Sequence, residues 1–266
     1  MADNIYTYWE NIATKFAPPP YVLLSLVSMQ RSLGGSFVFI GPKNASDYVD
    51  DETIEKNWRF TSIGSGERAE IRKIVAKSDY LRMKLVSDLG GYWLDADTVV
   101  LKDFRNNLTP LLPSGNLLWH CEAFFGATPG NSILNQAAGN MMTQDVQTWG
   151  NPGNLKGLIA DNGSLVRSID YGLVSPGYSP EYSFKTQEVV LRKDIPAEDF
   201  LLNDRQCILK LYNTALNDTG YADLGVEEFL DSEILLAKVF LSLESRQYWV
   251  DESTRFIAEH FANTGV

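Results

Sequence analysis

The stretch from Ser78 to Asp103, SDYLRMKLVSDLGGYWLDADTVVLKD, constrains this chain more than any other. It places four charged side chains among apolar residues that should form the core, namely Asp79, Arg82, Asp95 and Asp97. An unpaired ion in a protein interior is strongly destabilising even after its surroundings relax. The four charges therefore need partners, which are either one another or a ligand.

Residues 67–89 have the periodicity of one long amphipathic helix, whose apolar face carries Ile71, Ile74, Val75, Leu81, Leu85 and Leu89. Lysines and one aspartate lie opposite, at Lys73, Lys77, Lys84 and Asp88. Arg82 lies in the middle of the apolar face, with Asp79 three residues away and within reach. Either the two form an internal ion pair, or Arg82 faces a cleft with an anionic or polar ligand while Asp79 accepts hydrogen bonds from hydroxyls.

Gly90 and Gly91 end this helix, and residues 92–101 then favour a strand. Alternate strand residues share a face, so Asp95 and Asp97 would project together with Trp93, roughly 7 Å apart. Two carboxylates that close to a core repel each other, and a divalent cation relieves the repulsion. Oxygen ligands suit Mg²⁺ or Mn²⁺. The D-x-D pattern alone is weak, but its place directly after S-D-x-x-R and G-G is far more specific.

Strand and helix signals alternate along the first half of the chain. We expect strands at residues 4–9 and 36–40, a helix at 21–33 with Pro20 in its first turn, and partial helix at 44–58. This order predicts an α/β fold with a largely parallel sheet. In the second half we expect a strand at 117–125, a helix at 132–142, loops at 151–164 and partial helix at 226–248. No linker interrupts the composition, so residues 1–266 are predicted to form a single domain.

The totals exclude several classes of function. The chain has 266 residues, of which 44% are hydrophobic, and a net charge of −11. Such a surface repels nucleic acid and anionic lipid. Two cysteines, Cys121 and Cys207, favour a reducing compartment. Residues 1–16 lack the apolar region of a signal peptide, and no apolar run approaches the ~20 residues of a membrane helix. We therefore expect a soluble, cytoplasmic protein without a transmembrane segment.

The segment SDYLRMKLVSDLGGYWLDADTVVL resembles the core signature of metal-dependent glycosyltransferases of the GT-A fold. The nearest resemblance is to the capsular-polysaccharide-synthesis proteins and to the D-x-D sugar transferases related to yeast α-1,6-mannosyltransferase. The large clostridial glucosylating toxins share the arrangement. IYTYWEN, PPPYVLLSLVSMQRSL and KNASDYVDDETIEKNW also resemble the opening of the capsular-synthesis group. The resemblance covers residues 4–104 and implies a GT-A-like, Rossmann-type mixed and mostly parallel sheet flanked by helices.

The resemblance also implies roles for matched positions. Asp95 and Asp97 would hold Mn²⁺ or Mg²⁺ against the donor diphosphate. Asp79 and Arg82 would contact the transferred sugar, with Arg82 reaching toward the phosphate. Three aromatic residues would lie near the donor, with Tyr8 or Trp9 against the nucleotide base and Tyr92 just before the D-x-D pair.

A late histidine closes the metal site in related enzymes, which makes His260 the candidate third ligand. Asn217 and Asp218 are weaker candidates for that closing role. The other histidine, His120, is predicted to be a strand residue. Residues 1–104 would then bind the nucleotide sugar and metal, and residues 105–266 would form the acceptor side.

The predicted reaction moves a sugar from a UDP- or GDP-linked donor to a hydroxyl of a glycan or lipid-linked oligosaccharide acceptor, in polysaccharide biosynthesis. The resemblance implies retention of the anomeric configuration. An inverting enzyme would need a carboxylate base, for which Glu122, Asp161 and Asp204 stay open.

Two alternatives are weaker. A nucleotidylyltransferase would carry a glycine-rich, basic loop after its first strand, and YTYWENIATKFAPPP is not one. A degenerate, non-catalytic glycan-binding homologue would not need all four charges of the Ser78–Asp103 stretch.

Overall fold

The computed structural model describes residues 4–54, 56, 58–59, 67–112, 116–144, 146–174, 186–201 and 205–261. The chain divides into two compact units. The first unit comprises residues 1–14, 36–95 and 105–169, and the second comprises residues 15–35, 96–104 and 170–266. The expectation of a single domain with halves meeting near residue 104 stays a prediction. The units differ from those halves because the chain passes between them several times.

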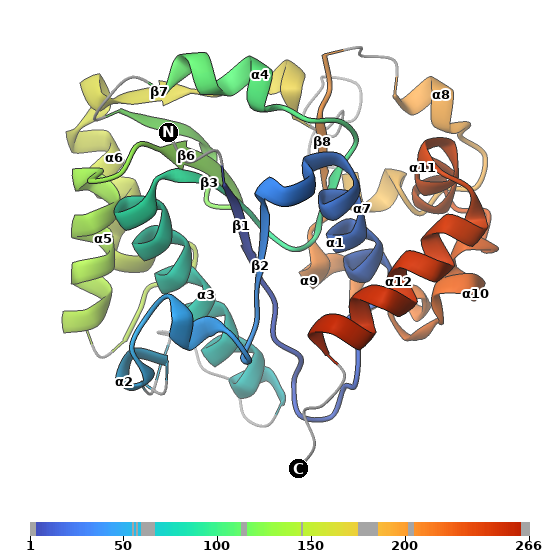
Figure 1. Cartoon of the computed structure of the whole chain (residues 1–266), viewed down its shortest axis with the longest axis horizontal. Helices are drawn as coiled ribbons and strands as arrows, with labels where there is room; N and C mark the ends of the chain where they lie inside the picture. Colours follow the sequence, from blue (N-terminus) through green and yellow to red (C-terminus); the bar gives the residue numbers. More distant parts are fainter. Residues whose placement is uncertain are drawn as a thin grey trace. The chain divides into compact units, whose positions relative to one another are not determined.

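A six-stranded sheet organises the first unit (Figure 1). Its strand order is β2 (Phe37–Ile40), β1 (Ile5–Tyr8), β3 (Gly91–Leu94), β6 (Phe124–Ala127), β5 (Leu117–Cys121) and β7 (Val166–Ser168). The pairs β2–β1, β1–β3 and β5–β7 are parallel, whereas β3–β6 and β6–β5 are antiparallel. The predicted α/β fold with a mixed, mostly parallel sheet is confirmed.

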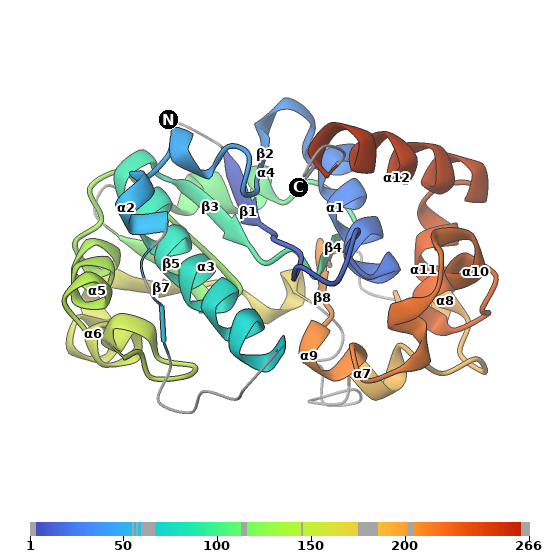
Figure 2. The ribbon, with the colours of Figure 1, turned by 90° about the horizontal axis from the view of Figure 1, so that it is seen from below.

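Helix α3 (Glu67–Leu89) packs on β1, β3 and β6, and α5 (Ser132–Thr143) lies beside it (Figures 1 and 2). The apolar side chains that α3 and α5 bury against the sheet form one core cluster, which includes Leu81, Leu85, Trp93, Phe125 and Leu134. Shorter helices complete this unit: α2 (Asp51–Ile54), α4 (Arg105–Leu108) and α6 (Leu155–Asp161). The helix predicted over residues 67–89 is therefore confirmed at both ends.

The double glycine makes the turn from α3 into β3. Gly90 has φ +70° and Gly91 has φ +99°, a region that favours glycine. A Cβ on Gly91 would lie 2.3 Å from the carbonyl oxygen of Asn4, and one on Gly90 would lie 2.5 Å from Cδ of Pro129. The close approach of the first residues of the chain thus requires glycine at this turn.

The second unit is built around α1 (Pro20–Leu33), which is almost entirely buried. It packs against β4 (Thr98–Val100), α10 (Val226–Leu230) and α12 (Arg246–His260). Strand β4 pairs antiparallel with β8 (Ile208–Lys210) in a separate two-stranded sheet. The remaining helices are α7 (Thr186–Val189), α8 (Ala197–Phe200), α9 (Asn213–Leu216) and α11 (Leu235–Leu243). No helix among the described residues is long and apolar enough to cross a membrane.

Three sequence predictions of local structure are corrected. The strand expected at 92–101 is broken into β3 and β4, because from Thr98 onward the backbone pairs with β8 instead of the main sheet. The strand expected at 117–125 is the hairpin β5–β6, which turns at residues 122–123. Residues 151–164 contain α6 rather than loops alone. The partial helix expected over residues 226–248 is confirmed, as α10, α11 and the start of α12.

Candidate functional site

The order of the sheet locates a ligand-binding edge. Strands β2 and β3 lie on opposite sides of β1 and both run parallel to it, with the chain crossing over through α1 and then α3. In open α/β sheets, ligands bind outside the carboxyl ends of the strands where the connections diverge in this way. Tyr6 of β1 pairs with Trp93 of β3 in parallel. Tyr8 therefore ends β1, with Trp9 directly after it, at the same edge where Asp95 follows β3. The sheet therefore brings these predicted site residues to one edge of the first unit.

Arg82 is the centre of the polar cluster at this edge. Arg82 is only 7% exposed, and its Nη2 pairs with Oδ1 of Asp79 one helical turn earlier. Nη1 donates a hydrogen bond to the carbonyl oxygen of Glu122 at 2.7 Å and lies 3.6 Å from Oδ1 of Asp95. The guanidinium also lies 5.7 Å from the ring of Trp93. The internal pair with Asp79 is therefore present, and Arg82 also meets Asp95. The alternative, a ligand at Arg82 with Asp79 accepting hydrogen bonds from its hydroxyls, stays a prediction.

Asp95 is the more accessible carboxylate of this cluster. Its side chain is 25% exposed, against 8% for that of Asp79. The indole Nε1 of Trp93 donates to Oδ1 of Asp95 at 2.8 Å, and the Asp95 amide bonds to the carbonyl of Ala123 at 3.0 Å. A ligand would therefore meet Asp95 first, with Asp79 and Arg82 behind it.

Burial and neighbouring charges set the protonation states of Asp79 and Arg82. Burial raises the pKa of Asp79 to about 6; Arg82 opposes the shift, and Asp95 and Glu122 add to it. Burial acts to lower the pKa of Arg82, but Asp79, Asp95 and Glu122 outweigh burial and raise it above its usual value. Arg82 therefore stays charged. Its Nε is buried and has no hydrogen-bond partner among the described residues, a cost that ordinary core positions rarely carry.

Residues after β1 form a second polar group at the same edge. Tyr8 donates its hydroxyl to Glu10, and Lys77 Nζ lies 2.6 Å from Oε2 of Glu10. Burial and the Glu10 carboxylate raise the pKa of Tyr8, so the phenol stays protonated. Lys77 was expected on the outward face of α3, but its side chain is only 15% exposed because Glu10 holds it against the sheet. Sequence reasoning missed this contact, since β1 and α3 are far apart along the chain.

The predicted aromatic contacts differ in exposure. Trp9 is partly buried, and its Nε1 donates to Oδ1 of Asn11 at 2.7 Å, which fixes the indole. Tyr92 is fully buried, and its hydroxyl lies 3.2 Å from Oγ1 of Thr109. Trp9 is therefore better placed than Tyr92 to meet a ligand, and the donor contact of Tyr92 stays a prediction.

The second aspartate of the D-x-D pattern belongs to the second unit. The shared strand face expected for Asp95 and Asp97 is wrong, because β3 ends at Leu94 and β4 begins at Thr98. Asp97 is buried and pairs through Oδ1 with Nζ of Lys210, while its Oδ2 accepts the Asn213 amide at 2.6 Å. Sequence reasoning missed Lys210, whose only signal is a lysine within the apolar run ILKL.

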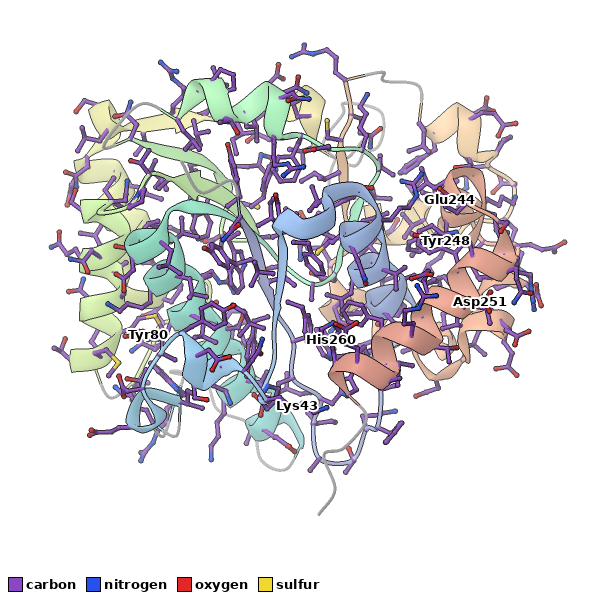
Figure 3. The ribbon with its side chains drawn as sticks, viewed as in Figure 1. Lys43, Tyr80, Glu244, Tyr248, Asp251 and His260 are labelled. Atoms are coloured by element: carbon purple, nitrogen blue, oxygen red, sulfur yellow. The ribbon has the colours of Figure 1, made fainter. Side chains whose placement is uncertain are left out.

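Two of the residues predicted to hold a metal, Asp97 and His260, have partners of their own within the second unit. His260 ends α12 (Figure 3), with its ring 4.4 Å from that of Phe256 and its Nε2 3.8 Å from Oε1 of Glu259. In the part of the chain that the structure describes, no group of three or more His, Cys, Asp and Glu side chains could hold a metal ion. Asn217 directly follows α9, and the charge of Asp218 helps to raise the pKa of Tyr21 after burial and Asp97.

The other predicted residues are dispersed. Asp161 is exposed at the end of α6, whereas Asp204 lies outside the described residues. Glu122 is at the β5–β6 turn beside Arg82, and its Oε1 lies 3.3 Å from Nζ of Lys156. Of the three carboxylates considered as a base, Glu122 is therefore the one that the described structure places beside the cluster. His120 lies on β5 as expected, and burial lowers its pKa to about 4.

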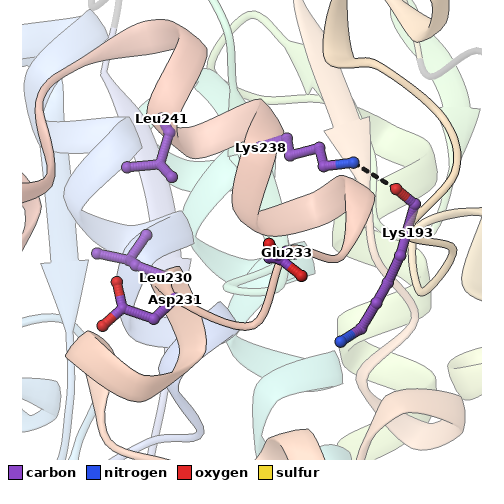
Figure 4. A pocket seen from close by; sticks show the side chains of 6 residues that line it. All are labelled: Lys193, Leu230, Asp231, Glu233, Lys238 and Leu241. Carbon is purple, nitrogen blue, oxygen red and sulfur yellow. Dashed lines mark hydrogen bonds between the residues drawn. The ribbon is translucent and has the colours of Figure 1, made fainter.

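A separate pocket lies in the second unit (Figure 4). It is lined by Lys193, Leu230, Asp231, Glu233, Lys238 and Leu241, and Lys238 donates to the backbone carbonyl of Lys193. None of the residues predicted to bind the donor lines this pocket. Asp231 is instead held by Arg246, which lowers its pKa.

Comparisons with solved structures return glycosyltransferases at low similarity. The "PaToxG Glycosyltransferase" is 13% identical, with 91% of this chain and 86% of that chain covered and a TM-score of 0.39. The glycosyltransferase GlyE of Streptococcus pneumoniae TIGR4 in its apo form is 13% identical, with 96% and 64% covered and a TM-score of 0.49. A second GlyE structure is 12% identical, with 99% and 66% covered and a TM-score of 0.46. The chain thus spans about two thirds of GlyE, and similarity at this level adds nothing to the functional argument.

The family comparison is more informative than these structures. No curated protein sequence matches. The matched segment, residues 1–119, contains the whole Ser78–Asp103 stretch together with β1, β2 and β3. The resemblance predicted from the sequence is confirmed over that segment: residues 1–119 match the family described as "Capsular polysaccharide synthesis protein".

Proposed function

We propose that this protein is a glycosyltransferase that moves a sugar from a UDP- or GDP-linked donor to a hydroxyl of a glycan or lipid-linked oligosaccharide, in the cytoplasm. The observation that carries the proposal is the Asp79–Arg82–Asp95 cluster at the carboxyl edge of β1 and β3. This is the edge where an open α/β sheet binds its ligands. The match of residues 1–119 to the capsular-synthesis family supports the same reaction class.

The cluster suits a donor that carries hydroxyls and phosphates. Asp95 presents carboxylate oxygens that can accept hydrogen bonds from sugar hydroxyls, and Arg82 fixes that carboxylate from behind. Negative charge grows on the diphosphate as the glycosidic bond breaks, and a cation that is already in position stabilises it. Arg82 stays charged and is held by oxygens of Asp79, Asp95 and Glu122, so its positive charge would be fixed behind Asp95 before a donor binds. The indole of Trp9 would stack on the nucleotide base.

The predicted divalent ion fits this arrangement poorly. Asp97 gives one oxygen to Lys210 and the other to the Asn213 amide, and His260 packs on Phe256. We therefore derive no step through a metal, and the predicted dependence on Mn²⁺ or Mg²⁺ at Asp95, Asp97 and His260 stays a prediction. If an ion binds, its chemistry would be neutralisation of the donor diphosphate.

The proposed stereochemical course is retention, which rests on the family resemblance. Retention without an enzymatic nucleophile requires no carboxylate base beside the acceptor. If the reaction inverts, Glu122 would be the proposed base, because the turn that carries it accepts a hydrogen bond from Arg82 through the Glu122 carbonyl. The configuration of the product separates the two courses.

A screen of UDP- and GDP-sugars by thermal shift and donor hydrolysis tests the function. We expect one donor to raise the melting temperature and to be hydrolysed by the wild type. We expect Asp95→Asn to lose both effects. Asp88→Asn is the matched control, since Asp88 pairs with Lys84 on the same helix as Asp79 but is 43% exposed in its side chain.

Two results would contradict the proposal. If no nucleotide sugar stabilises the protein, the cluster is structural. If turnover requires a nucleoside triphosphate and a sugar phosphate, the protein is a nucleotidylyltransferase.

Comparison of Trp9→Ala with Trp9→Phe tests base stacking, because only the alanine variant should weaken binding of free UDP or GDP.

A further inference from the structure

Asp97 has both carboxylate oxygens engaged by the chain's own donors. Lys210 Nζ pairs with Oδ1, and the backbone amide of Asn213 donates to Oδ2 at 2.6 Å. The antiparallel register opposes Thr98 and Lys210, and the Leu211 amide donates to the Asp97 carbonyl at 2.9 Å. The side chain and the backbone of Asp97 are thus both bound by the end of β8 and the residues directly after it.

Lys210 is held in place as firmly as its partner. It is the last residue of β8 and is 7% exposed. Its ammonium lies 5.8 Å from the ring of Tyr212, whose backbone is left-handed at φ 46° and leads into α9. The hydroxyl of Tyr21 donates to Oδ1 of Asn213 at 2.8 Å, which ties α1 to the same turn. The lysine therefore occupies a built position within the second unit.

An ammonium and a divalent cation compete for the same carboxylate oxygens. Mg²⁺ and Mn²⁺ need oxygen ligands close to the ion, and a second cation beside them is repelled in a poorly solvated site. Lys210 stands where such an ion would bind Oδ1 of Asp97. The described residues near Asp97 include no set of three metal-ligating side chains that could outweigh this repulsion.

We propose that Lys210 is the built-in counter-ion of Asp97 and takes the cation position that the D-x-D pattern predicts for a metal. Asp97 then binds no divalent ion while Lys210 is present, and the charge of this carboxylate is balanced from within the chain. Any consequence of this counter-ion for catalysis rests on the proposed glycosyltransferase function. The binding of Mn²⁺ itself can be measured without any donor, so the two proposals fail separately.

The test measures Mn²⁺ binding by electron paramagnetic resonance and by thermal shift in the absence of nucleotide. It compares the wild type, Lys210→Met and the double variant Asp97→Asn with Lys210→Met. Methionine keeps much of the length of the lysine without its charge. We expect Lys210→Met to bind Mn²⁺ at least about tenfold more tightly than the wild type. We expect the double variant to lose this gain, because the carboxylate that Lys210 vacated is then absent.

Wild-type binding that matches Lys210→Met and is lost in the double variant would overturn the proposal. Failure of Lys210→Met to bind Mn²⁺ more tightly than the wild type would also overturn it. If Lys210→Met does not fold, the wild type and the double variant still decide. Equal Mn²⁺ binding by those two supports Lys210 as the resident cation, and tighter binding by the wild type contradicts it. A second series with UDP and GDP shows whether nucleotides bind at all, and their failure to bind would contradict the transferase proposal alone.

Discussion

Nη1 of Arg82 lies 3.6 Å from Oδ1 of Asp95, and the same nitrogen donates to the carbonyl of Glu122 at 2.7 Å. The arginine comes from α3, the aspartate follows β3, and the glutamate forms the β5–β6 turn. One guanidinium therefore fixes three segments of the first unit relative to one another. This rigidity is what a binding site for a charged donor requires.

Arg82→Met should lower the free energy of unfolding by about 3–5 kcal/mol, because it leaves Asp79 buried without its ion partner. Arg82→Lys should cost less stability but should still weaken donor binding, since an ammonium cannot reach Asp79 and Asp95 together. Urea unfolding and donor titration measure the two effects. Donor binding unchanged in both variants would make the arginine a purely structural ion pair.

Asp79 should make stability fall with rising pH. Its pKa is raised from 3.8 to about 6, so between these values the native state holds a proton that the unfolded state has lost. The extra stability is complete below pH 4 and is lost as pH rises through 6. Between pH 4 and pH 7, the free energy of unfolding of the wild type should therefore fall by of the order of 3 kcal/mol relative to that of Asp79→Asn. Urea unfolding across this range checks the difference, and parallel curves for the two proteins would show that Asp79 titrates normally.

Glu122→Gln should leave the turnover number within several-fold of the wild type, because the proposed retaining course uses no carboxylate base. Asp161→Asn is the control, since Asp161 is exposed at the end of α6. Nuclear magnetic resonance of the early product should show that the transferred sugar keeps the anomeric configuration that it had in the donor. An inverted product, with a loss of about 100-fold or more in Glu122→Gln alone, would instead identify Glu122 as the general base.

Gly91→Ala should destabilise the protein by about 2 kcal/mol or more, because φ is +99° and the added Cβ would lie 2.3 Å from the Asn4 carbonyl oxygen. Gly35→Ala is the matched control, since no atom of the described part of the chain lies within 4 Å of its Cβ position. Thermal unfolding compares the two. Equal melting temperatures would mean that the first strand shifts freely away from the turn.

Sequence patterns predicted the parts of the site that depend on near neighbours. The helix over 67–89 and the pairing of Arg82 with Asp79 follow from helical periodicity, in which residues three apart meet. The carboxyl end of that helix was predictable from the double glycine, and Gly90 adopts the positive φ that ends a helix. The strand β2 was predictable for a similar reason, because glycines lie on both sides of its apolar run.

The break between β3 and β4 could not be predicted in this way. An apolar run such as YWLDADTVVL is compatible with one strand, and the break arises because residues 98–100 pair with residues 208–210. The same distant partner supplies Lys210 to Asp97. Likewise, Lys77 has the spacing of a solvent-facing residue, and only the position of Glu10 after β1 draws it inward. Long-range pairing, rather than local preference, decided each of these contacts.

The burial of α1 has a consequence for synthesis of the chain. This helix is synthesised well before α10 and α12, which are among the elements that cover it. Its apolar face must wait, exposed or shielded by a chaperone, until those two helices have been made. A fragment ending at residue 119 would keep α1 but lack both covering helices. Such a truncation should therefore aggregate rather than fold.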